Sequence, residues 1–140
     1  MKIQWSVLRE QGTRISHAAI LDREQLGALY TVWYLSSDGQ HESSYDQADD
    51  RPLTISQAFS SFDRLDSLRQ QQVNRLSALD LGSSVLSVLC CEVPDGLLIL
   101  DGNHRACALY ASGVRELHIL ATIISGPLSR TALPDLQHWS

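Results

Sequence analysis

The chain has 140 residues, of which 44% are hydrophobic and 19% are charged, and its formal net charge is −5 at pH 7. This length and composition predict a single globular domain, residues 1–140, and exclude a disordered chain. The acidic balance and the lack of a basic stripe make DNA an unsuitable partner, although one local cationic turn can still bind a nucleotide. The sequence shows neither a signal peptide nor an apolar run of membrane-spanning length, so we expect a cytoplasmic protein without membrane contact.

The N-terminal part of the chain predicts strands on either side of a short helix. Residues 3–8 have strand composition, and a second strand is expected near residues 15–21. Asp22 is followed three residues later by Gln25, which is typical of a helix N-terminus with a capping box. We expect this helix to run into a strand that ends near Leu35.

Residues 36–52 are polar and predict a long surface loop. The loop contains the turn signal Asp38-Gly39 and has almost no aliphatic residue, so we expect it to be the most mobile interior segment. Its side chains His41, Glu42 and Asp46 could supply a base to a nearby site. The simpler interpretation is a solvated loop, and the pattern leaves open whether it serves as a lid or as a docking surface.

A long helical pattern begins at Thr54, with Gln57 as its capping-box partner, and extends to Gly82. The pair Ser60-Ser61 predicts a break into two helices. The positions expected on the apolar side are Ile55, Phe59, Phe62, Leu65, Leu68, Val73, Leu76 and Leu79. The positions expected on the other face, interpreted as solvated with a partner surface as the alternative, are Asp63, Arg64, Arg69, Gln70, Gln71 and Arg75.

Two apolar runs predict a β-hairpin in the second half of the chain. Residues 85–93 and 97–100 flank the turn Pro94-Asp95-Gly96. The first run contains Cys90-Cys91, and neighbouring strand residues point to opposite faces, so these cysteines are not expected to pair with each other. We interpret the cysteines as buried reduced thiols.

A sharp polar turn follows the second run of the hairpin and opens a helix. This 101–105 turn reads Asp101-Gly102-Asn103-His104-Arg105. The helix should continue to Ser112 and end at Gly113 in a left-handed cap. It leads to a last strand over residues 117–124, which makes a βαβ crossover plausible. The tail from Gly126 is expected to be irregular, with Trp139 docked on the domain.

The 101–105 turn carries the residue types of an anion site. The N-terminus of a helix offers unpaired N–H groups, and Gly102 lets a ligand approach the backbone closely. Arg105 adds a planar cationic fork, and His104 could donate a hydrogen bond or carry a proton. Asn103 could be only the helix N-cap. Asp101, at the carboxyl end of a strand, could orient an acceptor hydroxyl or hold Mg²⁺ through water, or it could simply cap the turn.

Other kinds of site have weaker support, and the metal ligands stay unknown. The five histidines are scattered, and none has zinc-type spacing with a cysteine. Serine is too common in the chain to indicate a nucleophilic triad. The 101–105 turn is therefore the strongest candidate site.

Residues 85–124, with the Asp-Gly-Asn-His-Arg sequence between a strand and a short Ala-rich helix, resemble the ParB/sulfiredoxin-like superfamily. Its members place nucleotide phosphates on a helix opened by a Gly-x-His-Arg or Gly-x-Arg-Arg sequence, and here Gly102, His104 and Arg105 match. Sulfiredoxins have a catalytic cysteine where this chain has Asn103, so the resemblance does not imply their chemistry. ParB proteins continue into a helix-turn-helix domain, and we expect none in this chain because only residues 125–140 follow. The sequence is closer to the Asp-Gly-His-His-Arg of the superfamily's free serine kinases.

Together, the elements predict a small α/β or α+β domain in which a mixed sheet and flanking helices hold the 101–105 turn beside a cleft. The resemblance implies a nucleoside di- or triphosphate, with Mg²⁺, bound by Gly102, Asn103, His104 and Arg105. It also implies phosphoryl transfer or hydrolysis of a small phosphate-containing substrate, with Asp101 and His104 as the reacting groups. The alternative is a protein-binding module without activity, such as an immunity or regulatory protein, that docks through the acidic loop and the long helix.

Overall fold

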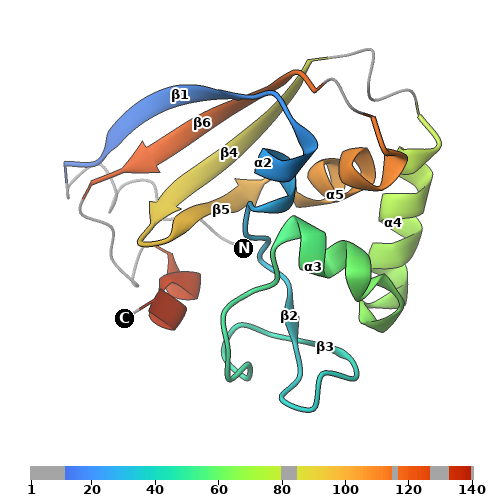
Figure 1. Cartoon of the computed structure of the whole chain (residues 1–140). Coiled ribbons are helices and arrows are strands. Elements are labelled where there is room, and N and C mark those ends of the chain that lie inside the picture. Colours follow the sequence, from blue (N-terminus) through green and yellow to red (C-terminus); the bar gives the residue numbers. More distant parts are fainter. Residues whose placement is uncertain (1–11, 80–84, 115–116, 127–132, 140) are drawn as a thin grey trace.

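The structure, a computed structural model, describes residues 12–79, 85–114, 117–126 and 133–139. Helices and strands alternate within this part, and Figure 1 shows the helices gathered beside a twisted sheet. The strand predicted over residues 3–8 lies outside the described residues. In chain order the elements are β1 (Arg14–Ile20), α2 (Arg23–Gly27), β2 (Tyr34–Leu35), β3 (Glu42–Ser43), α3 (Ile55–Ser60), the 3₁₀ helix η1 (Phe62–Arg64), α4 (Ser67–Ser77), β4 (Leu86–Val93), β5 (Gly96–Asp101), α5 (Asn103–Ser112), β6 (Ile119–Ser125) and the 3₁₀ helix η3 (Pro134–Trp139).

The main sheet has four strands in the order β1-β6-β4-β5. Strands β4 and β5 form the predicted hairpin, β6 runs parallel to β4, and β1 runs antiparallel to β6. This mixed sheet with its helices confirms the predicted α/β or α+β class. The crossover prediction is wrong in one respect, because β6 pairs with β4 and not with β5. The hairpin reverses the chain, so the strand parallel to β6 is the one before the turn.

Two apolar clusters lie on opposite faces of the sheet. The larger cluster joins α2, α3, α4 and α5 to one face, where Cys90 and Ile99 are fully buried. On the other face, Cys91 and Leu98 pack with Leu133. Adjacent strand residues therefore serve opposite faces, as predicted for Cys90 and Cys91, and both cysteines are buried free thiols.

The long helical segment is divided as predicted, but its apolar face is not continuous. The Thr54–Gln57 capping box is present, and α3 ends at Ser60. Helix α4 ends at Ser77 with Ala78 as its C-cap, so the prediction that the helix extends to Gly82 is wrong, although Gly82 itself lies outside the described residues. Phe59 is 44% exposed, Leu68 is 72% exposed and Leu79 is 58% exposed, so the prediction that they share a buried apolar side is wrong. The segment 61–66 reorients the chain, and a single helical period cannot hold across that break.

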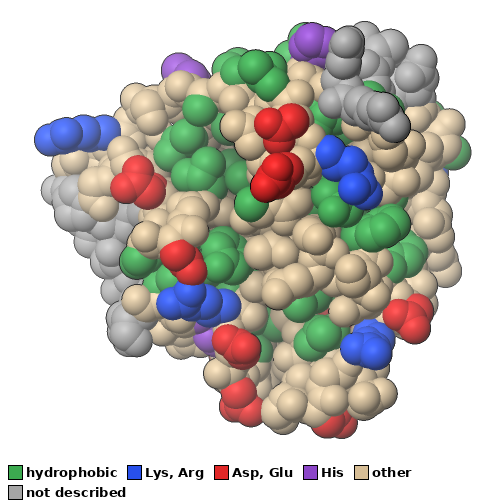
Figure 2. Space-filling view, in the orientation of Figure 1, with side chains coloured by type: hydrophobic (Ala, Val, Ile, Leu, Met, Phe, Trp, Pro, Cys, Tyr) green, Lys and Arg blue, Asp and Glu red, His purple; other side chains and the backbone are tan. Residues whose placement is uncertain are grey.

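The predicted loop over residues 36–52 contains a short strand. Residues Glu42–Ser43 pair with Tyr34–Leu35, and the turn between them includes Gly39 at a φ of 72°. Figure 1 shows this β2–β3 hairpin extending away from the main sheet, below α3. Acidic and basic side chains are interspersed over the face in Figure 2.

The C-terminal segment docks on the domain, as predicted for Trp139. The indole N–H of Trp139 donates to Asp95 at 2.8 Å, and its ring meets that of Tyr30 edge to face. The expectation of an irregular tail is wrong for residues 134–139, which form η3. The Tyr34 hydroxyl donates to buried Asp135 at 2.6 Å and so ties η3 to β2. None of the helices in the described part of the chain is long and apolar enough to cross a membrane.

Candidate functional site

The 101–105 turn connects β5 to α5 as predicted. Gly102 precedes the first helical residue, and its φ of 102° is one that L side chains rarely adopt. A Cβ atom at this position would lie 2.9 Å from Cγ1 of Val88 on the neighbouring strand β4. The Gly102 carbonyl accepts the first hydrogen bond of the helix from Ala106 at 2.9 Å. Backbone conformation and close packing therefore both require glycine here.

Asn103 joins the turn to a distant segment of the chain. It is the first residue of α5, so the predicted N-cap role is wrong and Gly102 occupies the cap position. The Asn103 side chain is buried; its amide donates to the Ile99 carbonyl at 3.1 Å, and its oxygen accepts from the Val32 N–H at 3.3 Å. These two hydrogen bonds fix residues 32–33 against the start of α5.

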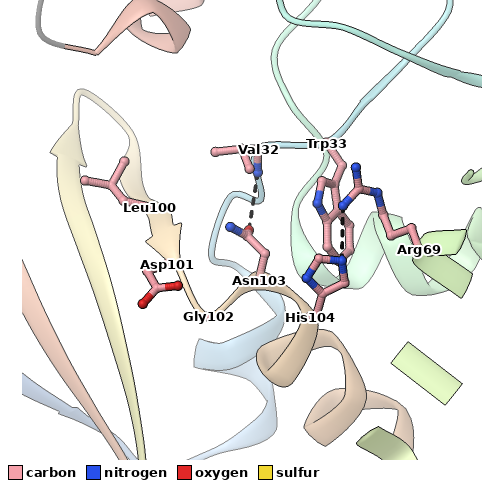
Figure 3. A pocket seen from close by; sticks show the side chains of 8 residues that line it. All are labelled: Val32, Trp33, Arg69, Leu100, Asp101, Gly102, Asn103 and His104. Atoms are coloured by element: carbon pink, nitrogen blue, oxygen red, sulfur yellow. Dashed lines mark hydrogen bonds between the residues drawn. The ribbon is translucent and has the colours of Figure 1, made fainter. Parts of the chain in front are cut away.

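A cavity of about 370 Å³ opens between the turn and this fixed segment. Figure 3 shows Asp101 and Leu100 on the β5 side and Arg69 on the opposite side. The N–H groups of the first turn of α5 lack partners within the helix, and Gly102 has no side chain to cap them. The residues that line the cavity are Val32, Trp33, Arg69, Leu100, Asp101, Gly102, Asn103 and His104.

Arg69 reaches the cavity from α4 and is held on three sides. Its Nε and Nη2 donate to the two carboxylate oxygens of Glu42 at 2.6 and 3.0 Å, and the guanidinium lies 4.6 Å from the centre of the Trp33 ring. Its Nη1 lies 3.2 Å from Nε2 of His104. The Glu42 and Arg69 side chains are only 16% and 24% exposed. A bidentate pair so shielded from solvent holds the guanidinium in one orientation.

His104 lies in the first turn of α5 and lines the cavity beside Arg69. Its ring also contacts the ring of buried Trp33, at 5.2 Å between centroids. Burial lowers the pKa of His104, and the nearby Arg69 charge lowers it further, while Glu42 acts in the opposite direction. The imidazole is therefore neutral near pH 7, and the cluster of His104, Arg69 and Glu42 beside the cavity has no net charge.

The structure brings together four of the five residues of the 101–105 turn around the cavity. Asp101 is exposed at the end of β5, and Gly102, Asn103 and His104 follow it along the wall. Arg105 is half-buried in the first turn of α5 and is not among the residues that line the cavity. Any contact between Arg105 and a ligand would therefore lie outside this cavity.

The opposite wall could not be identified from the sequence. Arg69 was interpreted as part of a solvated face, and that interpretation is wrong because its guanidinium binds Glu42 and lines the cavity. Glu42 was considered only as a base from a mobile loop, but the β2–β3 hairpin presents it to Arg69. The sequence offered only a weak signal for this pair, namely the opposite charges of Glu42 and Arg69. No local pattern relates two positions that are 27 residues apart.

Other chemistry-bearing residues do not add to the site. Burial raises the pKa of Cys107, in α5, to about 11 and that of both Cys90 and Cys91 to about 12. Such thiols stay protonated near neutral pH and are poor nucleophiles. Across the described ranges, no group of three or more His, Cys, Asp or Glu side chains could hold a metal ion.

Comparison of the chain with protein-family models, with curated proteins and with solved structures finds no match. The interpretation of this cavity therefore depends on its own residues and geometry.

Proposed function

We propose that the chain binds the phosphate group of a small molecule, and specifically a nucleoside di- or triphosphate, in the cavity at the start of α5. The observation that carries the proposal is the Gly102 turn, which begins a ten-residue helix beside a cavity of about 370 Å³. Backbone N–H groups and the helix dipole both favour an anion at this position.

Side chains around the turn add donors to the backbone N–H groups. His104 lines the cavity, and half-buried Arg105 lies one residue further along the first turn. The Arg69 charge is already balanced by Glu42, so the ligand would rely on hydrogen-bond donors more than on net charge. That arrangement suits a phosphate oxygen and is consistent with membership of the ParB/sulfiredoxin-like superfamily, which we retain as part of the proposal.

Phosphoryl transfer or hydrolysis is the reaction that such a site would perform. Among the described residues that line the cavity, Asp101 is the one carboxylate, and it would accept the proton of an attacking hydroxyl group or water. His104, which also lines the cavity, would donate a hydrogen bond to a phosphate oxygen. A single carboxylate fits Mg²⁺ that is carried in by the nucleotide, because this ion commonly binds one or two carboxylates together with substrate phosphates and water.

The direct test is thermal unfolding in the presence of a panel of nucleoside di- and triphosphates, with and without Mg²⁺. We expect a stabilising shift for at least one nucleotide, since a ligand that binds only the folded state raises the unfolding temperature. The absence of any shift at millimolar nucleotide would refute the proposal and favour the alternative of a protein-binding module.

Two arginine variants sharpen this test. Arg105 does not line the cavity, so Arg105→Ala should weaken nucleotide binding about tenfold to hundredfold only if part of the nucleotide extends beyond the cavity to its fork. Arg105→Lys should recover part of the loss, because lysine keeps the charge but not the planar fork. Arg75→Ala, at an exposed position of α4, is the matched control and should leave binding unchanged. Equal affinity of Arg105→Ala and the wild type would exclude Arg105 from the site.

A further inference from the structure

The contact between Arg69 and His104 fixes the position of a proton. A guanidinium group has N–H donors and no acceptor, and its Nη1 lies 3.2 Å from Nε2 of His104. Nε2 must therefore present its lone pair to Arg69. A neutral imidazole carries one proton, so the proton of His104 is on Nδ1.

Arg69 cannot turn away from this contact without losing stronger ones. Its two remaining nitrogens are bound to Glu42, and one face of the guanidinium packs on Trp33. The three partners come from β3, α5 and the segment before β2, so the orientation of Arg69 depends on the tertiary fold. The sequence places Glu42 and Arg69 27 residues apart.

We infer that Glu42 and Arg69 form a positioning pair that locks His104 as a neutral imidazole with its Nδ1–H available to a ligand in the cavity. Figure 3 shows Nε2 of His104 joined to Arg69, with the other ring nitrogen on the side of Asn103. His104 is then a fixed hydrogen-bond donor, and its proton-carrying role is excluded. The inference about the imidazole concerns the protein without ligand, whereas its role toward a ligand rests on the proposed function.

The fixed Nδ1–H donor of His104 limits which chemical groups of a ligand can bind beside it. The neutral Nδ1–H of His104 donates to a hydrogen-bond acceptor, such as a phosphate or carboxylate oxygen, and offers no acceptor to a ligand N–H group. The charged groups that face His104 are Arg69 from α4 and Glu42 from β3, with Asp101 of β5 lining the same cavity. Of these groups, only Asp101 can serve as a general base, because Glu42 is occupied by Arg69.

The tautomer can be measured directly on the full chain. Long-range ¹H–¹⁵N spectra of the imidazole rings distinguish a protonated ring nitrogen from an unprotonated one, and His104→Gln identifies the signals of His104. Near neutral pH we expect protonated Nδ1 and unprotonated Nε2 at this residue, with exposed His118 as the internal comparison. A protonated Nε2, a fully charged ring or rapid exchange between tautomers would each overturn the inference.

Substitution of Arg69 tests whether the pair causes the lock. Arg69→Met keeps the length of the side chain but removes every donor, so Nε2 can take a proton and donate to Glu42. We expect the His104 signals to change to the other tautomer or to the charged ring, with titration at higher pH than in the wild type. Arg75→Met, on an exposed position of the same helix, should leave the signals unchanged. Unchanged signals in folded Arg69→Met would refute the role of the pair.

Titration with inorganic phosphate and with a nucleoside diphosphate separates this inference from the proposed function. We expect the wild-type Nδ1–H signal to move on binding and Arg69→Met to bind at least several-fold more weakly. A locked tautomer with no response to either probe would refute the phosphate site and the ligand role of His104, and leave the lock itself standing. Binding of a probe without any change at Nδ1 would overturn the donor role alone.

Discussion

The two walls of the cavity are built by different kinds of interaction. The wall formed by the 101–105 turn is set by backbone conformation and close packing. Gly102 leaves no room for a Cβ atom beside Val88, and the side chain of Asn103 is buried. The opposite wall is set by side chains, through the contacts of Arg69 with Glu42 and His104. We expect changes to the first wall to lower the free energy of unfolding more than changes to the second. Substitutions in the first wall should therefore lower mainly the stability of the fold, and substitutions in the second wall should lower mainly the affinity for a ligand.

The largest effect is expected from Gly102→Ala. The new Cβ atom would meet Val88 at 2.9 Å, and alanine would occupy a positive φ. We expect the free energy of unfolding to fall by about 2–5 kcal/mol, measured by urea denaturation. Gly113→Ala is the matched control, because it has a positive φ of 73° but nothing within 4 Å of the new atom, and should cost about 1–2 kcal/mol. Equal losses would mean that the contact with Val88 does not constrain the turn.

A smaller loss is expected from Asn103→Ala. This substitution leaves the Val32 N–H and the Ile99 carbonyl without the hydrogen bonds that Asn103 provides. We expect destabilisation of about 1–3 kcal/mol, together with faster amide exchange at Val32. Asn74→Ala, at an exposed position of α4, should be close to neutral. A fully stable Asn103→Ala protein would show that the two walls are not joined through this side chain.

The difference between the walls also explains what could be predicted from the sequence. The residues of the first wall are consecutive in the sequence. An apolar run, a glycine and a helical period were enough to predict that Asp101, Gly102 and His104 lie beside a cavity. The residue assigned the main anion contact, Arg105, lies in the predicted turn but not on the cavity wall. Sequence spacing identifies the first turn of a helix, but which side of it faces a cavity depends on how the helix packs.

The second wall depends on contacts that have no local pattern. Arg69 occupies a helix position that looks solvated because its partner, Glu42, lies in a hairpin that was interpreted as a loop. That hairpin consists of two residue pairs, Tyr34 with Ser43 and Leu35 with Glu42. Strands this short carry too few side chains for an alternating pattern, so β3 could not be recognised. The exposed Leu68 shows the same limit, because apolar spacing across a break in the chain does not define one face.

Glu42→Gln probes the side-chain wall with a modest expected effect on stability. Glutamine has the same shape but only one acceptor oxygen, so one of the two hydrogen bonds from Arg69 is lost together with the negative charge. We expect a loss of about 1–2 kcal/mol in the free energy of unfolding, because one hydrogen bond is removed and the other loses its charge assistance. In Glu42→Gln, the loss of nucleotide-binding free energy should exceed the loss of unfolding free energy. Asn103→Ala should reduce both. A loss comparable with that of Gly102→Ala would contradict the division between the walls.

The smallest expected effect is a dependence of stability on pH that comes from His104. Burial and the Arg69 charge lower the pKa of His104 in the folded protein, whereas the unfolded chain has the ordinary value of about 6.5. Below about pH 6.5 the unfolded state therefore binds more protons than the folded state, and the contribution of the neutral imidazole to stability is lost as the pH falls through the pKa of the folded protein.

His104→Gln lacks this pH-dependent contribution, so the difference in unfolding free energy between wild type and variant should decrease on acidification from neutral pH. Buried Asp135, whose pKa is raised, titrates in both proteins and cancels in that difference. Urea denaturation of both proteins across this range, with His118→Gln as the exposed control, measures the effect. A constant difference would mean that His104 has the same affinity for protons folded and unfolded, which is incompatible with its contact to Arg69.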